Sequence, residues 1–101
     1  MFPIVRFRVD DRSMEPTLNP GDYVLVNRWS YKSGEPARGD LVVVRDPQQP
    51  ARFLVKRISD VTNGGSCFLA GDNVEFSRDS RAFGPVPKDL VVGRVWKAAK
   101  P

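Results

Sequence analysis

A serine and a lysine in this sequence could together form a catalytic pair. Ser13 follows a stretch with strand-like alternation and precedes a Pro-Gly turn, where a rigid support can hold a hydroxyl at the surface. Lys56 lies in the apolar stretch 52–59, and two-residue alternation puts it on the same face as Leu54 and Ile58. A lysine among apolar side chains loses hydration, which lowers its pKa and makes the neutral amine available as a general base. The pair therefore predicts a serine nucleophile activated by a lysine.

Each of the two residues also has a purely structural interpretation. Ser13 could cap a short helical turn over residues 14–18, and Lys56 could cover its apolar neighbours with its methylenes while its charge reaches water. The composition bears on this choice, because the sequence contains no histidine. Ser-His-Asp triads, Cys-His pairs and histidine proton shuttles are thereby excluded. A serine with a desolvated lysine is then the one obvious route to an activated hydroxyl.

The remaining composition narrows the chemistry further. Cys67 is the only cysteine, which excludes an internal disulfide framework and a cysteine-rich metal site, and we expect it to be a small buried apolar side chain. We expect no metal and no cofactor. The uncharged apolar runs are short and Arg6 follows the amino terminus closely, so we expect no signal peptide, no membrane-spanning segment and a cytoplasmic location.

Length and periodicity predict one small, mainly β domain over residues 1–101. The chain has 101 residues, of which 41% are hydrophobic and 28% charged, as in soluble globular proteins. Apolar residues recur mostly with period two, which indicates a small folded antiparallel sheet, barrel-like, with little helix. Asn63-Gly64 is the best hairpin signal, and the tail 97–101 is expected to fray. The expected strands are residues 4–9, 23–28, 40–45, 52–59, 67–70 and 90–96.

Four ordered blocks resemble the type I signal peptidase superfamily. They are SMEPTL at 13–18, GDYVLV at 21–26, KR at 56–57, and GDN at 71–73 leading into SRDSRAFG at 77–84, with GDLVV at 39–43 between them. Together they span most of the chain. The resemblance implies the mainly β catalytic core of a serine endopeptidase with a Ser/Lys dyad, in which Ser13 is the acylating nucleophile and Lys56 its general base.

The resemblance also implies roles around the dyad. Ser77 matches the serine that orients the lysine by a hydrogen bond, with a turn serine as the structural alternative. The Ser13 backbone N–H would contribute to the oxyanion hole. We expect Asp72, Asp79 and Arg81 to be structural residues that support the site through charge-assisted contacts.

The chain departs from the superfamily pattern near the serine. Asp11 stands where bacterial members often have Ser or Gly, and an ionised carboxylate cannot donate a hydrogen bond to an oxyanion. After Lys56-Arg57 the usual Gly-x-Pro-Gly-Asp continuation is missing, so a shorter turn is expected. The membrane anchor and the inserted second domain of many bacterial signal peptidases are not expected either. The sequence is therefore most similar to the soluble nickel-type superoxide dismutase maturation proteases, which remove an N-terminal extension from a precursor.

This assignment predicts a protein partner for the site. We expect a precursor protein or peptide, such as a nickel superoxide dismutase precursor, to bind as an extended strand along an exposed sheet edge near Lys56. Small substrate residues near the cut are what the resemblance implies.

Two other functions remain open. One is a peripheral signal peptidase that acts on secretory precursors, with aromatic side chains at a lipid interface (Trp29, Tyr31, Phe83 or Trp96). The other is a non-catalytic basic β-barrel that binds nucleic acid or protein, consistent with the net charge of +4 and the interleaved cations and aromatics (Arg6, Arg8, Arg28, Lys32, Arg45, Trp29, Tyr31, Phe53). Because such aromatics are more often core and such arginines solvated surface, nucleic acid is not the expected partner.

Overall fold

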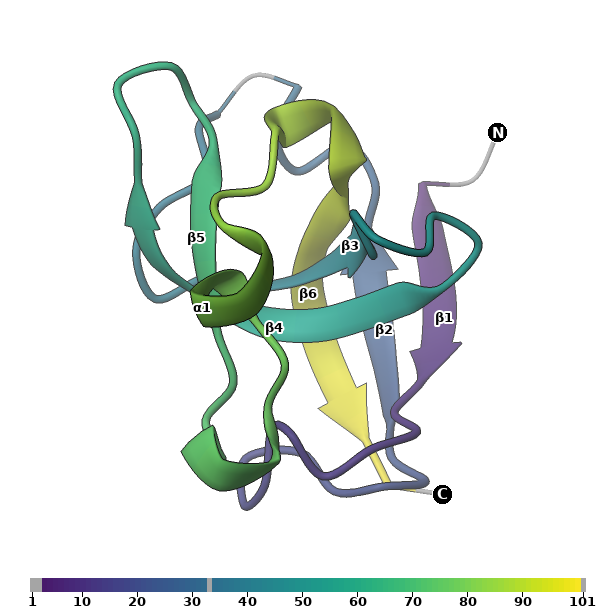
Figure 1. Ribbon diagram of the computed structural model, residues 1–101. Coiled ribbons are helices and arrows are strands. Elements are labelled where there is room, and N and C mark those ends of the chain that lie inside the picture. Colours follow the sequence, from purple (N-terminus) through teal and green to yellow (C-terminus); the bar gives the residue numbers. More distant parts are fainter. Residues whose placement is uncertain (1–2, 33, 101) are drawn as a thin grey trace.

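The computed structural model describes residues 3–32 and 34–100, which form a six-stranded antiparallel sheet with three short helical segments (Figure 1). This confirms the mainly β class. The strands are β1 (Ile4–Arg8), β2 (Tyr23–Asn27), β3 (Leu41–Arg45), β4 (Phe53–Val61), β5 (Cys67–Ala70) and β6 (Val91–Ala99). The helical segments are η1 (Val74–Phe76), α1 (Ser80–Phe83) and η2 (Lys88–Leu90).

The sheet runs in the order β1-β2-β6-β3-β4-β5, with every neighbouring pair antiparallel. The last strand of the chain, β6, therefore lies between β2 and β3. Register shifts interrupt three of the pairings, and such bulges increase the local twist of a sheet. The Phe7 ring of edge strand β1 lies 5.0 Å from the Phe53 ring at the start of β4. The sheet thus folds over until two strands that are not hydrogen-bonded to each other meet.

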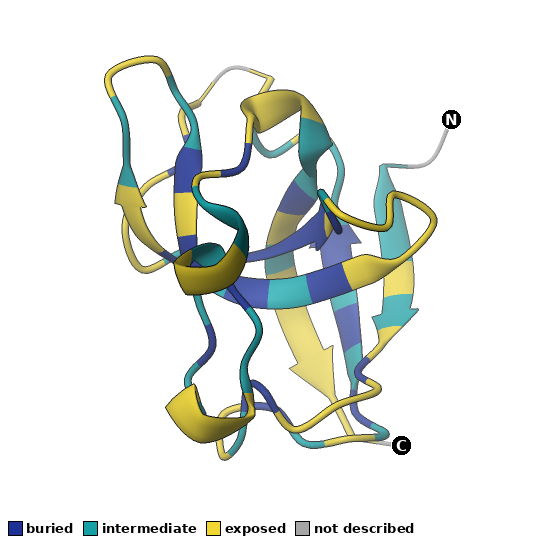
Figure 2. Cartoon of the chain, in the orientation of Figure 1, coloured by how far each residue is buried: buried dark blue, intermediate teal, exposed yellow. Residues whose placement is uncertain are grey.

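Strand β3 separates two hydrophobic clusters. Val42, Val43 and Val44 are all fully buried, but Val43 belongs to a different cluster from its two neighbours because successive side chains point to opposite faces. One cluster contains Val42, Val44, Leu54, Ile58, Cys67, Leu69 and Val86. The other contains Val9, Met14, Leu18, Val24, Val26 and Val43. Figure 2 shows buried positions on β2, β3, β4 and β5, whereas the end of β6 is exposed.

The outer edge of β5 is covered by the segment that contains α1. Cys67 and Val86 form an isolated antiparallel bridge, and the Leu69 N–H donates to Ser80 Oγ at 2.7 Å. The Val86 carbonyl and the Ser80 side chain thus accept hydrogen bonds from N–H groups of β5, which an open sheet edge would present to solvent or to other chains. This coverage attaches residues 77–86 to the sheet and sets the position of Ser77.

The strands differ from the expected ones mainly at their ends. The hairpin expected at Asn63-Gly64 is confirmed, with Gly65 at φ +89° in the loop between β4 and β5. The expected fraying of the tail was wrong for residues 97–99, because they pair with β2 up to Tyr23↔Ala99. Pro101 lies outside the described residues. In the described part of the chain, no helix has both the length and the apolar character needed to cross a bilayer.

Candidate active site

Ser13 lies in the loop that follows β1 and is 3% exposed. The loop is anchored by Met14 and Leu18, whose side chains are buried in the same cluster as Val9. Residues 14–18 form a turn with a hydrogen bond from Leu18 N–H to the Met14 carbonyl at 2.9 Å, and not a regular helix. Packing of the two apolar side chains therefore positions the serine.

The hydroxyl of Ser13 donates a hydrogen bond to Asp11 Oδ1 at 2.8 Å, and the Ser13 backbone N–H donates to the same oxygen at 3.1 Å. On the other side, the Ser13 carbonyl accepts a bond from Asn73 N–H at 2.8 Å. From the sequence, Asp11 was expected only to lack an oxyanion donor, and its two bonds to Ser13 were not predicted. The hydrogen bonds found among residues 3–32 and 34–100 do not include one from Ser13 Oγ to Lys56.

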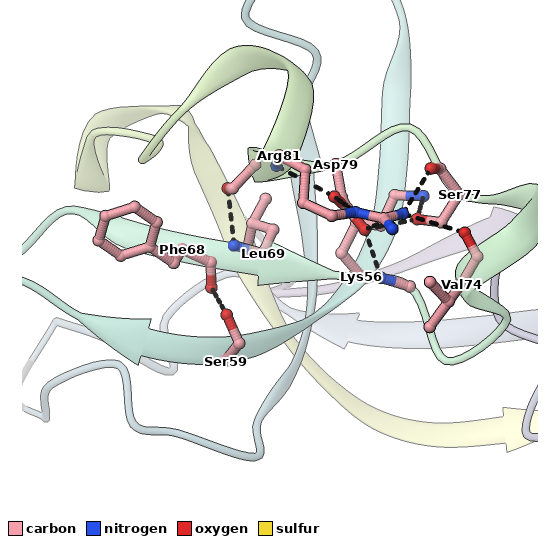
Figure 3. A network of polar contacts seen from close by, with 10 residues as sticks. Lys56, Ser59, Phe68, Leu69, Val74, Ser77, Asp79 and Arg81 are labelled. Carbon is pink, nitrogen blue, oxygen red and sulfur yellow. Dashed lines mark hydrogen bonds and ion pairs between the residues drawn. The ribbon is translucent and has the colours of Figure 1, made fainter.

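Lys56 lies in β4 on the buried face, opposite Val42 of β3, and is 1% exposed. Its neighbours on that face, Leu54 and Ile58, are buried as alternation predicts. The interpretation in which its charge reaches water was therefore wrong. Its amine Nζ donates a hydrogen bond to Ser77 Oγ at 3.1 Å (Figure 3).

Burial lowers the pKa of the Lys56 amine below its ordinary value, because the ammonium form loses hydration. The carboxylates of Asp11 and Asp79 oppose this effect, whereas the nearby charges of Arg78 and Arg52 add to it. A lysine with a lowered pKa has a larger neutral fraction near neutral pH, and the neutral amine can accept a proton. The electrostatics of the site therefore suit a general base.

Ser77 connects Lys56 to a buried carboxylate (Figure 3). Its hydroxyl accepts from Lys56 and donates to Asp79 Oδ2 at 2.9 Å. Asp79 also accepts bonds from the Arg81 side chain at 3.0 Å and from the Gly71 N–H at 3.1 Å. Burial raises the pKa of Asp79, but the hydrogen bonds from Arg81, Gly71 and Ser77 outweigh it and bring the pKa to about 2. Asp79 is thus ionised and holds Ser77 in one orientation.

This carboxylate predicts a loss of stability in acid. The folded-state pKa of Asp79 is about 2 against an ordinary 3.8, so its ionised form stabilises the folded protein above about pH 4, and this contribution disappears as the pH falls towards 2. At about 1.4 kcal/mol per pKa unit, it amounts to about 2 kcal/mol. Asp79→Asn should therefore lower the free energy of unfolding most at neutral pH and least in acid. Urea unfolding at several pH values measures this, and a difference that does not change with pH would contradict it.

Gly71 brings the serine and lysine sides of the site together. A Cβ atom at this position would lie 2.2 Å from Ser77 Oγ and 2.7 Å from the Ser13 carbonyl oxygen. Side chains do not approach so closely, and only the absence of a side chain at Gly71 lets the two segments meet there. Gly71 belongs to the GDN block, but this role was not predicted from the sequence.

Asp72 ties the Ser13 loop to β4. Its carboxylate accepts two bonds from the Arg57 side chain, both at 2.9 Å, and one from Thr17 Oγ1 at 2.6 Å. The bonds from Arg57, and also the one from Thr17, lower the pKa of Asp72 although burial opposes them. Arg57 and Thr17 were not singled out from the sequence, although both belong to the blocks KR and SMEPTL.

A groove of about 410 Å³ runs between β1 and the start of β4, and Asp11 and Ser13 line it. Within residues 3–32 and 34–100, β1 pairs only with β2, and β4 pairs with β5 only from Arg57 onwards. Each strand therefore has an edge without a strand partner among the described residues, over residues 4–8 and 53–56. An extended peptide could hydrogen-bond to such an edge. The same described residues contain no cluster of His, Cys, Asp and Glu that could hold a metal ion.

Comparison with known proteins relates this arrangement to one family of peptidases. The family described as signal peptidase, peptidase S26, matches residues 1–62 and 59–97. The chain is 38% identical to mitochondrial ATP-independent inner membrane protease subunit 1b of Arabidopsis thaliana, over 84% of the chain and 64% of the relative. It is 36% identical to mitochondrial inner membrane protease subunit 2 of Danio rerio, over 92% of the chain and 64% of the relative. It is 34% identical to signal peptidase I of Pseudomonas fluorescens, over 81% of the chain and 30% of the relative.

These relatives contradict the expected location and support the expected assignment only at the level of the superfamily. The expected cytoplasmic location is contradicted, because two of the three relatives are named as inner membrane proteases. The family match and the likeness to signal peptidase I support the signal peptidase superfamily, but none of the three names mentions superoxide dismutase, so the finer assignment is not shown. The chain spans less than two thirds of the length of each relative.

Proposed function

This chain belongs to the peptidase S26 family of signal peptidases, and from that premise we propose that it cleaves peptide bonds with Ser13 as nucleophile and Lys56 as general base. The observation that carries the proposal is the burial of Lys56, which is 1% exposed and holds its amine against Ser77 in the same site as the Ser13 loop. A lysine is rarely buried so completely unless it is paired. Here the buried amine is bonded to a serine hydroxyl instead of to a carboxylate.

The reaction proceeds through an acyl-enzyme. Neutral Lys56 accepts the Ser13 hydroxyl proton while Ser13 Oγ forms a bond to the substrate carbonyl carbon, and Lys56 then returns this proton to the leaving amine as the C–N bond breaks. Water attacks the ester with Lys56 as base, and the proton passes to Ser13 Oγ as the C–O bond breaks. The Ser13 backbone N–H donates to the oxyanion, a type of contact worth roughly 10²- to 10³-fold in rate.

Ser77, Asp79 and Arg81 support the base in this mechanism. Asp79 accepts a hydrogen bond from the Ser77 hydroxyl, which leaves the Ser77 oxygen lone pairs directed at the Lys56 amine. Arg81 in turn holds Asp79 through the bond at 3.0 Å. A base held in this way needs little reorganisation when it accepts the proton.

The substrate is a precursor protein that carries an N-terminal extension, bound as an extended strand in the groove between β1 and β4. Main-chain hydrogen bonds to the strand edges would supply affinity, and the groove would select side chains near the cut. The first candidate is a nickel-type superoxide dismutase precursor. The second is a secretory precursor with a signal peptide, which is favoured by the likeness to signal peptidase I.

Peripheral contact with a lipid surface fits the second candidate. Trp29 and Trp96 are 45% and 66% exposed and could rest at a lipid interface. Tyr31 and Phe83, which the sequence suggested for the same role, instead pack against the core, and the Tyr31 hydroxyl donates to Asp40 at 2.6 Å. Sedimentation with liposomes would separate a lipid-bound protein from one that stays in solution.

Ser13→Ala tests the proposed function. We expect cleavage of the precursor to fall by at least about 10³-fold, because no other group replaces the nucleophile. Mass spectrometry of each candidate precursor, incubated with parent or variant protein, identifies the cut and the preferred substrate. Ser66→Ala in the β4–β5 loop is the matched control and should cleave like the parent. Undiminished cleavage by Ser13→Ala would refute the proposal.

A further inference from the structure

One carboxylate occupies both groups that the proposed reaction requires from Ser13. Asp11 Oδ1 accepts the Ser13 hydroxyl at 2.8 Å and the Ser13 backbone N–H at 3.1 Å. In the reaction the hydroxyl must give its proton to Lys56, and the N–H must donate to the oxyanion. Neither can happen while both point at Asp11.

A carboxylate in this position also opposes the transition state electrostatically. Negative charge develops on the substrate oxygen next to the Ser13 N–H, and an ionised Asp11 there would repel it without being able to donate a hydrogen bond. Asp11 is exposed and lines the groove, so its side chain can turn into water. The charge-assisted bonds to Ser13 resist that turn, because they are stronger than neutral ones.

We propose, on the premise of the proposed function, that Asp11 is a positioning residue that holds Ser13 in an unreactive arrangement until a peptide bound in the groove displaces its carboxylate. At substrate concentrations below KM, the observed rate is then the intrinsic rate multiplied by the fraction of free enzyme in which Asp11 has turned away, so the contact raises KM. This residue therefore sets how much of the enzyme is competent before substrate arrives.

The Asp11 carboxylate also influences the pKa of Lys56, the proposed general base. The charged groups that influence Lys56 are Asp11, Asp79, Arg78 and Arg52, and the first two raise its pKa. Without the charge of Asp11, only the Asp79 carboxylate among these groups still raises the pKa of Lys56, and Arg78 and Arg52 oppose it. The pKa of Lys56 then falls, and the acid side of the rate profile moves to lower pH.

A purely structural role for Asp11 makes different predictions. An Asp side chain that accepts the N–H two residues on forms a local turn, and Asn forms the same turn without the charge. Asp11→Asn thus preserves the shape of the loop and weakens the hold on the hydroxyl. Asp11→Ala removes both the bond that shapes the turn and the bond to the hydroxyl.

The experiment measures kcat, KM and melting temperature for the parent, Asp11→Asn and Asp11→Ala, using a quenched fluorescent peptide with alanine before the cut. Across the pH range in which Lys56 titrates, Asp11→Asn should raise kcat/KM about three- to tenfold, mainly through a lower KM, shift the acid limb of the kcat/KM profile to lower pH and leave the melting temperature unchanged. Asp11→Ala should show the same kinetic gain with a lower melting temperature. Asp60→Asn, which removes an exposed charge elsewhere on β4, should match the parent.

The outcomes separate this inference from the proposed function. If Asp11→Asn equals the parent in kcat/KM and in pH profile, Asp11 only shapes the turn, and the inference is overturned. A lower kcat/KM in Asp11→Asn would mean that the carboxylate assists the reaction, which also overturns it. Ser13→Ala is assayed alongside, because cleavage by that variant, or none by the parent and Asp11→Asn alike, counts against the proposed function itself.

Discussion

Lys56→Met should abolish peptide cleavage while leaving the fold intact. Methionine fills a similar volume among Leu54 and Ile58, but it cannot accept the Ser13 proton, so we expect kcat to fall by at least about 10³-fold. Ser77 keeps its bond to Asp79 when the amine is removed. Cleavage kinetics and thermal unfolding of the same sample measure both effects.

The stability of this variant should also differ in its pH dependence. Because burial lowers the pKa of Lys56 in the folded state, the unfolded chain binds the proton more tightly, and the parent gains stability as the pH rises from the folded pKa to about 10.4. Below the folded pKa the buried ammonium destabilises the parent. Lys56→Met lacks this dependence, so its advantage in the free energy of unfolding should be largest at lower pH.

Two controls make the Lys56 result specific. Lys97→Met changes an exposed lysine of β6 and should leave cleavage and stability as in the parent. Lys56→Arg keeps the positive charge but introduces a planar guanidinium that does not deprotonate, so it should be inactive and less stable. If Lys56→Met retained cleavage, another group would have to be the base.

Gly71→Ala should damage both stability and activity. The new Cβ would lie 2.2 Å from Ser77 Oγ and 2.7 Å from the backbone oxygen of Ser13, and neither neighbour can yield easily. Ser77 is bonded to Lys56 and Asp79, and the Ser13 carbonyl belongs to the main chain. We expect a loss of about 1–3 kcal/mol, typical of overpacking, and a fall in kcat of about 10²-fold as the serine and lysine move apart.

Gly64→Ala provides the comparison for this substitution. A Cβ at Gly64 would meet only Thr62 Oγ1 at 3.9 Å, an ordinary contact. This variant should therefore unfold and cleave like the parent. Equal melting temperatures and rates for Gly71→Ala and Gly64→Ala would show that the close approach at Gly71 does not matter.

Local sequence patterns predicted the strands and the burial of Lys56. Alternation in residues 52–59 placed Lys56 on the face that the structure buries, because the side-chain period of a strand depends only on the backbone. Hairpin chemistry at Asn63-Gly64 identified the turn between β4 and β5. The insertion of β6 between β2 and β3 could not be predicted, because it depends on pairing between segments far apart in sequence.

The sequence predicted which residues belong to the candidate site better than it predicted the contacts between them. The family blocks pointed to Ser77, and the structure places its hydroxyl 3.1 Å from the Lys56 amine. They gave no indication that Asp11 would hold the Ser13 hydroxyl, because that contact depends on how the loop turns after β1. The catalytic roles of Ser13 and Lys56 stay predictions until the variants are assayed.

The place of β6 has a consequence for the order in which the fold forms. The strands that lead to Ser13 and to Lys56 belong to separate hairpins, and in the sheet Val91–Ala99 lies between these hairpins. Each hairpin pairs neighbouring strands of the sequence, whereas β6 pairs with strands far from it in sequence, so we expect its contacts to form later because closing a longer loop costs more entropy. The supports of Ser13 and Lys56 therefore come into register with each other only when β6 has paired with both hairpins.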